Sequence, residues 1–259
     1  MSDMVAGGWI LVFLLAQPPA ARDYQKATEL FAKHDLKGAE AALDESLQVD
    51  PQYVPALVLK ARLAVIAGRM DVARRALAAA VAADPKQSGP RFLLGFCLYL
   101  DNDFQGASDA LARADQDDAR VSLYVALSEE GMNHTDAATL YYERSLKLDP
   151  VNAEARVAYS RLLRRQGKLD RAEALIDEAL KPAPDAREVL YEKGQCRFER
   201  GVYAQAAEFG ERALAAPGPA PTERQIRFLL VRAYLKAGNR DAAAKHRAIF
   251  ESLPMPLVR

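Results

Sequence analysis

Two short stretches of the chain carry residue types that could do chemistry. Glu129, Glu130 and His134 bring two carboxylates and an imidazole close together in sequence, and these are the groups used in general acid–base catalysis. Asp101 and Asp103 alternate in LDNDFQG, as the first oxygen ligands of a calcium loop do. Each stretch therefore defines a site hypothesis that the surrounding sequence can test.

The surrounding sequence favours neither site. A calcium loop starting at Asp101 would need an acidic ligand at its twelfth position, where Ala112 stands. The Glu129–His134 group falls near an expected turn between helices, where solvated charges are usual. No glycine-rich phosphate loop, H-E-x-x-H helix or G-x-S-x-G elbow occurs. We therefore expect a protein that is not an enzyme, with no cofactor and no metal site.

The two cysteines and three histidines also argue against a metal or redox site. Cys97 and Cys196 have no C-x-x-C spacing, and no histidine has a second ligand type at a metal-binding offset. We expect both cysteines to be reduced thiols packed in the core, too far apart for a disulfide.

Charge and composition restrict the class of partner. The chain has 259 residues, half of them apolar, and its 35 Lys and Arg residues balance 35 Asp and Glu residues. A balanced charge gives no bias toward nucleic acid, so we expect no nucleic-acid partner. Alanine is abundant and β-branched residues form no alternating runs, which favours an all-helical protein.

The N-terminus carries a separate apolar leader, assigned to residues 1–19. Residues 4–16, MVAGGWILVFLLA, match the length of a signal-peptide core and are short for a membrane span. No Lys or Arg precedes them, and the alternative is a buried N-terminal helix. We expect export to the periplasm or medium, or membrane attachment through residues 4–16, with a cytoplasmic location as the alternative.

The rest of the chain has an internal period. Pro51 and Pro85 are 34 residues apart, as are Pro150 and Pro184, and 65 residues separate Pro85 from Pro150. A period of this length is typical of stacked helical repeats, with three residues missing from one unit. The units begin near residues 20, 54, 88, 119, 153, 187 and 224.

Other positions keep the same register. With the proline at position 32, position 20 is always alanine, and position 8 is small in every unit except the last, which has Val231. Small residues allow helices to approach closely. Gly68, Gly167, Gly201 and Gly238 stand near position 15, where a turn between two helices needs left-handed backbone angles.

These positions resemble the tetratricopeptide repeat (TPR) family. The family pattern is clearest at Leu94, Gly95, Leu98, Ala107 and Leu111, whereas the family tryptophan is missing throughout. The resemblance implies an all-α fold over residues 20–257: a right-handed α-solenoid of about seven TPR-like helix-turn-helix repeats.

Two irregularities interrupt the period. ADQDDAR, residues 114–120, carries the three-residue deletion, and APGPAPTE, residues 216–223, is an insertion before the last repeat. A small change in superhelical twist accounts for both, because loop length varies at little cost. A hinge is the alternative.

The resemblance also implies a concave groove built from first-helix positions 2, 5, 6, 9, 12 and 13. Repeats two to four place apolar and aromatic residues there, and repeat five places arginines there. The predicted groove residues are Val58, Leu59, Phe92, Phe96, Tyr99, Leu123, Tyr124, Arg161, Arg164 and Arg165. An apolar channel with an arginine edge would accept a segment of a protein partner. The alternative is that these side chains are buried against one another.

The resulting function hypothesis is a non-catalytic scaffold that binds a peptide or protein segment in this groove. One alternative is a structural, oligomeric subunit of an envelope or secretion complex, which would self-associate without ligand. A second is an enzyme accessory domain, which would need a cleft with converging ionisable groups. The sequence does not identify the partner, because repeat residues mainly encode packing.

Overall fold

The computed structural model describes residues 18–254, which form fourteen α-helices and, within that range, no strand. The helices are α2 (Pro19–Ala32), α3 (Leu36–Val49), α4 (Val54–Ile66), α5 (Met70–Ala83), α6 (Ser88–Leu100), α7 (Phe104–Leu111), α8 (Ala119–Gly131), α9 (Thr135–Leu148), α10 (Ala153–Arg165), α11 (Leu169–Leu180), α12 (Arg187–Glu199), α13 (Tyr203–Ala215), α14 (Glu223–Lys236) and α15 (Arg240–Ser252). The predicted all-α fold class is confirmed.

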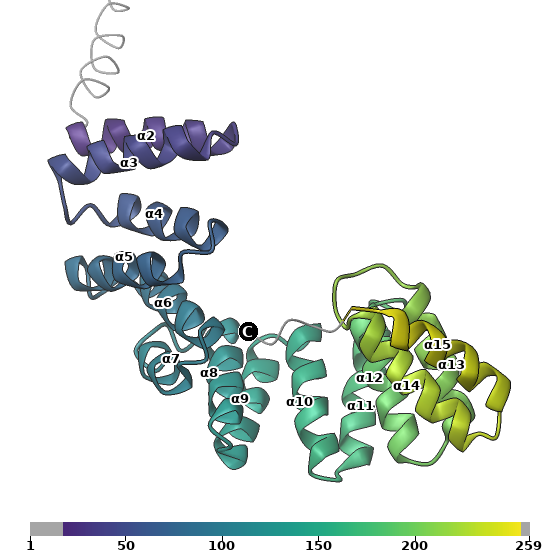
Figure 1. The fold of residues 1–259 in the computed structure, drawn as a ribbon. Coiled ribbons are helices and arrows are strands. Elements are labelled where there is room, and N and C mark those ends of the chain that lie inside the picture. Colours follow the sequence, from purple (N-terminus) through teal and green to yellow (C-terminus); the bar gives the residue numbers. More distant parts are fainter. Residues whose placement is uncertain (1–17, 255–259) are drawn as a thin grey trace, which may run out of the picture. The chain divides into compact units, whose positions relative to one another are not determined.

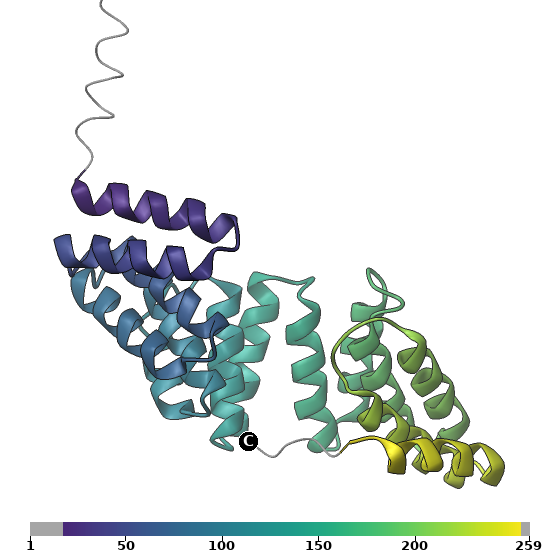
Figure 2. The ribbon, with the colours of Figure 1, turned by 45° about the horizontal axis from the view of Figure 1, so that its top comes forward.

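Figures 1 and 2 show that the helices pair in chain order into helical hairpins. The fourteen helices of residues 18–254 form seven such hairpins. The first helices are α2, α4, α6, α8, α10, α12 and α14, and each packs against the second helix that follows it. Most second helices also pack against the next first helix, so each hairpin is buried mainly by its neighbours in sequence. The chain is therefore a helical solenoid of repeats.

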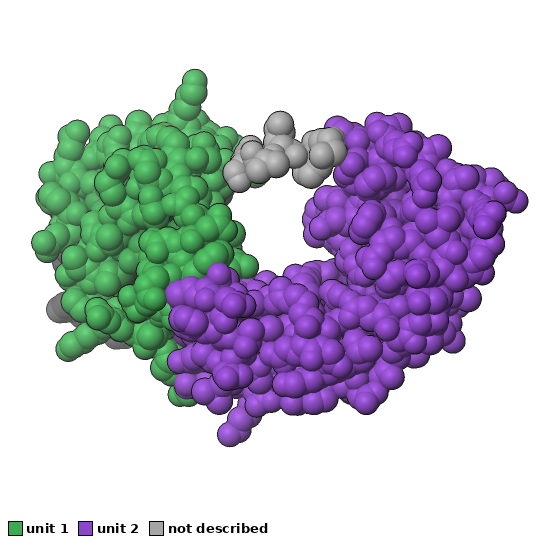
Figure 3. Space-filling view, turned by 60° about the horizontal axis from the view of Figure 1, so that its bottom comes forward, with its two compact units in different colours: residues 1–117 green, residues 118–259 purple. Residues whose placement is uncertain are grey.

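The chain divides into two compact units, coloured separately in Figure 3. Unit 1 ends at Asp117 and contains the hairpins from α2 to α7. Unit 2 begins at Asp118 and contains those from α8 to α15.

A left-handed residue turns the chain inside every hairpin. The predicted glycines Gly68, Gly167, Gly201 and Gly238 all have positive φ, from 70° to 81°. His34, Asn102 and Asn133 take the same conformation in the other three hairpins, with φ of 60°, 61° and 64°. The glycine prediction is confirmed. The three side-chain-bearing residues show that the turn imposes this conformation even where glycine is absent.

The repeated Asp-Pro pairs end second helices, as the sequence predicts. Asp50, Asp84 and Asp149 follow the last residues of α3, α5 and α9 and have extended backbone angles, with φ near −135°. Each aspartate also accepts a hydrogen bond from the backbone N–H two residues later, at 3.0–3.3 Å. The aspartate therefore stabilises the turn into the next hairpin, in addition to preceding the proline.

Small residues bring the helices together. The seven alanines at position 20 are all buried, with exposed fractions of 0–1%. At position 27, Ser46 and Ser145 are also buried, and each hydroxyl donates to a carbonyl at the start of its partner helix, at 2.7 and 2.8 Å. Gly95, on α6, lies so close to α7 that an added Cβ would stand 2.5 Å from Leu111 Cγ. Side-chain size at these positions therefore limits how closely the helices pack.

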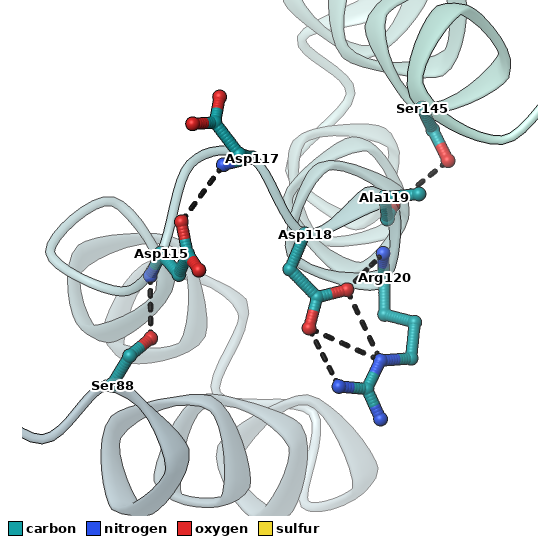
Figure 4. A network of polar contacts seen from close by, with 7 residues as sticks. All are labelled: Ser88, Asp115, Asp117, Asp118, Ala119, Arg120 and Ser145. Carbon is teal, nitrogen blue, oxygen red and sulfur yellow. Dashed lines mark hydrogen bonds and ion pairs between the residues drawn. The ribbon is translucent and has the colours of Figure 1, made fainter.

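The three-residue deletion shortens the second helix of the third hairpin. α7 has eight residues, whereas the other second helices have 12 to 14. In place of the last turn, the Asp115 N–H donates to Ser88 Oγ at 2.6 Å (Figure 4). On the other side of the unit boundary, Asp118 caps α8 and forms an ion pair with Arg120 at 2.6 Å (Figure 4). The deletion thus coincides with the boundary between the units.

The leader predicted for residues 4–16 lies outside the described residues. In residues 18–254, no helix has the length and apolar character needed to cross a membrane.

Candidate partner-binding surface

The first helices of unit 1 form a hollow with a volume of about 420 Å³. α2 contributes Tyr24, Thr28 and Phe31, and α4 contributes five residues. The complete lining is Tyr24, Thr28, Phe31, Val54, Pro55, Val58, Leu59, Arg62, Gln87, Gly89, Pro90 and Leu93. We call this the first hollow. Most of these residues occupy the repeat positions assigned to a concave groove.

A second hollow of about 330 Å³ lies between α4 and α6, with Leu77 of α5 in its wall. Its lining is Ala61, Arg62, Val65, Ile66, Leu77, Leu93, Phe96 and Cys97. Arg62 is the one charged residue among them and also lines the first hollow. Two apolar hollows therefore share a border that carries a guanidinium group.

Arg62 has no carboxylate partner within residues 18–254. Its guanidinium lies 5.4 Å from the centroid of the Phe31 ring, a cation–π contact, and no Asp or Glu of the described chain lies within ion-pair distance. Arg69 and Arg74 of the same unit are paired instead, with Glu40 at 2.8 Å and Asp101 at 2.7 Å. Arg62 is thus a positive charge on an apolar surface that the unit does not neutralise.

The predicted groove residues of unit 1 fall on or beside this surface. Val58 lines the first hollow, and Leu59, which is 4% exposed, contributes to its floor. Phe96 lines the second hollow and stacks on Phe92, with ring centroids 6.4 Å apart. Tyr99 is half-buried and contacts the ring of Phe104 at 6.0 Å.

In unit 2 the structure corrects the prediction for Leu123. Its side chain is 1% exposed and belongs to the hydrophobic core around Tyr142 and Tyr159, so it offers no contact surface. Tyr124 is half-buried, and its hydroxyl donates to Glu154 at 3.3 Å. Position 5 of a first helix thus faces the core in α8, whereas in α4 it lines a hollow.

The three guanidinium groups of the predicted arginine edge are all paired inside unit 2. Arg161 pairs with Glu188 at 3.1 Å, and Arg165 pairs with Glu130. Arg164 pairs with Glu192 at 2.7 Å and with Glu199 at 2.5 Å. These arginines link α10 to the helices beside it.

Arg161 and Arg164 line a polar hollow of about 360 Å³ with residues of α12 and the start of α14. Burial raises the pKa of Glu192 above its ordinary range, against the opposing effect of Arg164. The Glu192 carboxylate raises the pKa of Arg164 in turn, although burial opposes it. Gln195 donates to Tyr191 Oη at 2.6 Å in the same hollow. The charged side chains that line this hollow therefore form a network of ion pairs between α10 and α12.

The stretches that could do chemistry take structural roles. Asp103 accepts from the Gly106 N–H at 3.0 Å and caps α7, while Asp101 pairs with Arg74 at 2.7 Å. Glu129 lies 2.9 Å from His134 Nδ1. Within residues 18–254 no three His, Cys, Asp or Glu side chains are arranged to hold a metal ion.

Glu130 makes more interactions with other side chains than the sequence analysis predicted. Its carboxylate accepts from Tyr142 Oη at 2.7 Å and pairs with Arg165, so it lies in a network between helices. The sequence predicts solvated charges for all three residues of this group. The prediction holds for His134, whose side chain is 59% exposed, but not for Glu129 and Glu130, whose side chains are 14% and 17% exposed.

Both cysteines are free and buried, which confirms the prediction of reduced thiols in the core. Burial raises the pKa of Cys196 to about 12 and also raises that of Cys97.

Sequence reasoning missed Arg62. It occupies position 9 of the second repeat, one of the groove positions, but the prediction for that repeat named only apolar residues. The sequence did contain a signal for this residue, namely an arginine among apolar residues at the groove positions. Its lack of an ion-pair partner could only be seen in the structure.

Comparison with known families gives consistent matches along the chain. Two sequence profiles described as tetratricopeptide repeat match residues 30–88 and 64–130 in one case, and 126–186 and 160–221 in the other. Together they extend from residue 30 to residue 221, more than half of the chain. No curated protein sequence matches the chain.

Solved structures share the fold at low sequence identity. A tetratricopeptide repeat protein from Parabacteroides merdae superposes with a TM-score of 0.75 at 14% identity, covering 93% of this chain and 95% of that one. The Cut9–Hcn1 structure gives a TM-score of 0.68 at 18% identity, covering 83% of this chain and 43% of that one. Yeast Tom70 gives 0.61 at 18% identity, covering 81% of this chain and 46% of that one. The chain thus spans less than half the length of the last two.

Proposed function

Because this chain belongs to the tetratricopeptide repeat family, we propose that it is a non-catalytic scaffold that binds a segment of a partner protein on the first-helix surface of unit 1. The observation that carries this proposal is the pair of hollows of about 420 and 330 Å³, lined mainly by apolar side chains. Hollows of this size accommodate large side chains of a bound segment, and the burial of apolar surface supplies affinity.

Unit 1 is preferred over unit 2 as the binding surface because of the difference between their hollows. The polar hollow of unit 2 is lined by ion-paired side chains, and a ligand there would have to compete with the Arg164 pairs. The hollows of unit 1 contain no such pair, so apolar contact is available without breaking internal interactions.

Export remains part of the proposal. It rests on the apolar residues 4–16, and the mature N-terminus of the native protein, measured by mass spectrometry, tests it. A mature chain that begins after about residue 16 would support export, and an intact N-terminus would leave membrane attachment or a cytoplasmic location.

A peptide-display selection on the full-length protein tests the binding function. We expect enriched segments rich in large apolar residues, and we expect Val58→Glu to weaken binding of a selected peptide by at least about tenfold, because it places a charge in the first hollow. Leu140→Glu is the matched control: Leu140 is 64% exposed on α9 and lines neither hollow. Equal loss in both variants, or no enrichment on the wild type, would contradict the proposed surface.

A further inference from the structure

Arg62 gives the binding surface of unit 1 a specific chemistry. The guanidinium stands where the first and second hollows meet, and both hollows are otherwise lined mainly by apolar side chains and contain no acidic residue. A segment that fills both hollows must cross Arg62. The residue of the segment that lies over Arg62 therefore meets a positive charge.

The state of Arg62 before binding determines which residue fits there. Within the described chain Arg62 has only the cation–π contact with Phe31, at 5.4 Å, and no carboxylate partner. A bound apolar segment would remove water from around this charge, and an uncompensated charge in a drier environment is costly. A carboxylate on the segment would replace the lost water with charge-assisted hydrogen bonds, in the bidentate geometry that a guanidinium favours.

We propose that the partner segment contains an acidic residue, Asp or Glu, with large apolar residues on both sides of it in the chain, and that its carboxylate pairs with Arg62 while the apolar side chains fill the two hollows. This inference rests on the proposed function and names the partner's chemistry. The acid is an internal residue and not a C-terminal carboxylate, because a hollow lies on each side of Arg62 and the chain must continue in both directions.

The arrangement also separates affinity from specificity. The apolar hollows supply most of the affinity, because the free energy gained by burying apolar surface is non-directional and grows with the area removed from water. The carboxylate supplies selection against segments with a basic residue at that point, because like charges would then meet in a partly desolvated site.

The test uses a display library whose random segment lies between fixed flanks, so that no displayed peptide offers a free terminus. It is selected on the full-length wild type, on Arg62→Glu and on Arg75→Glu. Arg75 is the matched control, because it is an exposed arginine of the same unit on a second helix, paired with Asp71 four residues earlier at 2.7 Å. Circular dichroism checks that each variant retains its helices.

We expect the wild type and Arg75→Glu to enrich an acidic residue flanked by large apolar residues, and Arg62→Glu to enrich a basic or neutral residue at the same point. A synthetic peptide from the wild-type selection should bind the wild type about tenfold more tightly than its amide counterpart, with Glu replaced by Gln. Arg62→Gln should bind the two peptides equally.

Results that contradict the role of Arg62 can be told apart from results that contradict the binding function. Enrichment of apolar segments without an acid, lost in Val58→Glu but unchanged in Arg62→Glu, would overturn the role of Arg62 and leave the binding function intact. An acidic residue enriched equally on Arg62→Glu would also overturn it. If nothing is enriched on the wild type, the binding function and this inference both fail.

Discussion

Arg164 Nε lies 2.7 Å from a carboxylate oxygen of Glu192, a residue that is only 1% exposed. The pair joins α10 to α12 in unit 2, and Glu199 at the end of α12 also contacts the same guanidinium. A buried carboxylate of this kind depends on its partner, because removal of one member of a buried ion pair leaves the other charge uncompensated.

Arg164→Gln should destabilise the protein by about 3 kcal/mol at neutral pH, because it leaves Glu192 buried without its ion-pair partner. Urea unfolding followed by circular dichroism measures the change. The matched control is Arg161→Gln, which breaks an exposed pair with Glu188 in the same hollow and should cost less than about 1 kcal/mol.

The same variant should show a characteristic pH dependence. Burial already raises the pKa of Glu192, and loss of Arg164 should raise it further. A carboxyl whose pKa is higher in the folded state than in the unfolded state binds more protons when folded, so stability falls as the pH rises above the ordinary carboxyl range. The difference in stability between Arg164→Gln and wild type should therefore shrink on acidification, and a constant difference would contradict the buried-charge explanation.

Tyr159→Phe tests a second pair that is sensitive to pH. Tyr159 Oη donates to Glu143 at 2.8 Å, and this hydrogen bond, followed by that from Arg171, lowers the pKa of Glu143. The variant should cost about 1 kcal/mol at neutral pH. A lowered carboxyl pKa gives stability that is present above the ordinary value of 4.5 and is lost as the pH falls through the folded value.

The cost of Tyr159→Phe should therefore decrease in acid. It should also decrease in alkali, because burial raises the pKa of Tyr159 from 10 to about 12, and a raised tyrosine pKa makes the wild type lose stability as the pH rises through that interval. Thermal unfolding from pH 3 to pH 11 measures both limbs. A cost that does not vary with pH would show that the hydrogen bond has no linkage to ionisation.

Gly95→Ala should destabilise unit 1 by about 1–3 kcal/mol, because the added methyl group would stand 2.5 Å from Leu111 Cγ. Gly89→Ala is the matched control on the same helix: nothing lies within 4 Å of its Cβ position, so alanine there should be neutral or slightly stabilising. Urea midpoints of both variants make the comparison. Equal changes in stability for the two variants would mean that helix propensity, and not the contact between α6 and α7, determines the effect of alanine at position 95.

His34→Gly should stabilise the protein by about 0.5–1 kcal/mol, because His34 holds a φ of 60° that glycine adopts without strain. Gly68→Ala, at the equivalent turn of the next hairpin with φ of 70°, should lose about 1 kcal/mol or more. The two substitutions should have opposite signs in differential scanning calorimetry. A loss in His34→Gly would indicate that its imidazole makes a contribution that outweighs the backbone strain.

Cys97 and Cys196 should not react with a water-soluble thiol reagent at pH 8 in the folded protein, because both are buried and burial raises the pKa of each. Both should react in urea. Since Cys97 also lines the second hollow, selective reaction of Cys97 in the folded state would show that this hollow opens further than the structure describes.

The sequence alone determined the repeat. Position 20 is alanine in every repeat, Asp-Pro recurs at the ends of second helices, and glycine recurs in the turns, because packing within a stacked repeat imposes the same local demand each time. Each of these signals acts over one or two turns of helix, so it can be read without knowing what lies beside it.

Only the tertiary structure decided which charges are available and which apolar residues are exposed. Arg164 and Arg62 both occupy groove positions, yet Glu192 and Glu199 lie beside Arg164, whereas no carboxylate of the described chain pairs with Arg62. Leu123 and Val58 share position 5, yet one is buried in a core and the other lines a hollow. These outcomes depend on side chains brought together from neighbouring hairpins, and the spacing of residues along the chain does not encode that proximity.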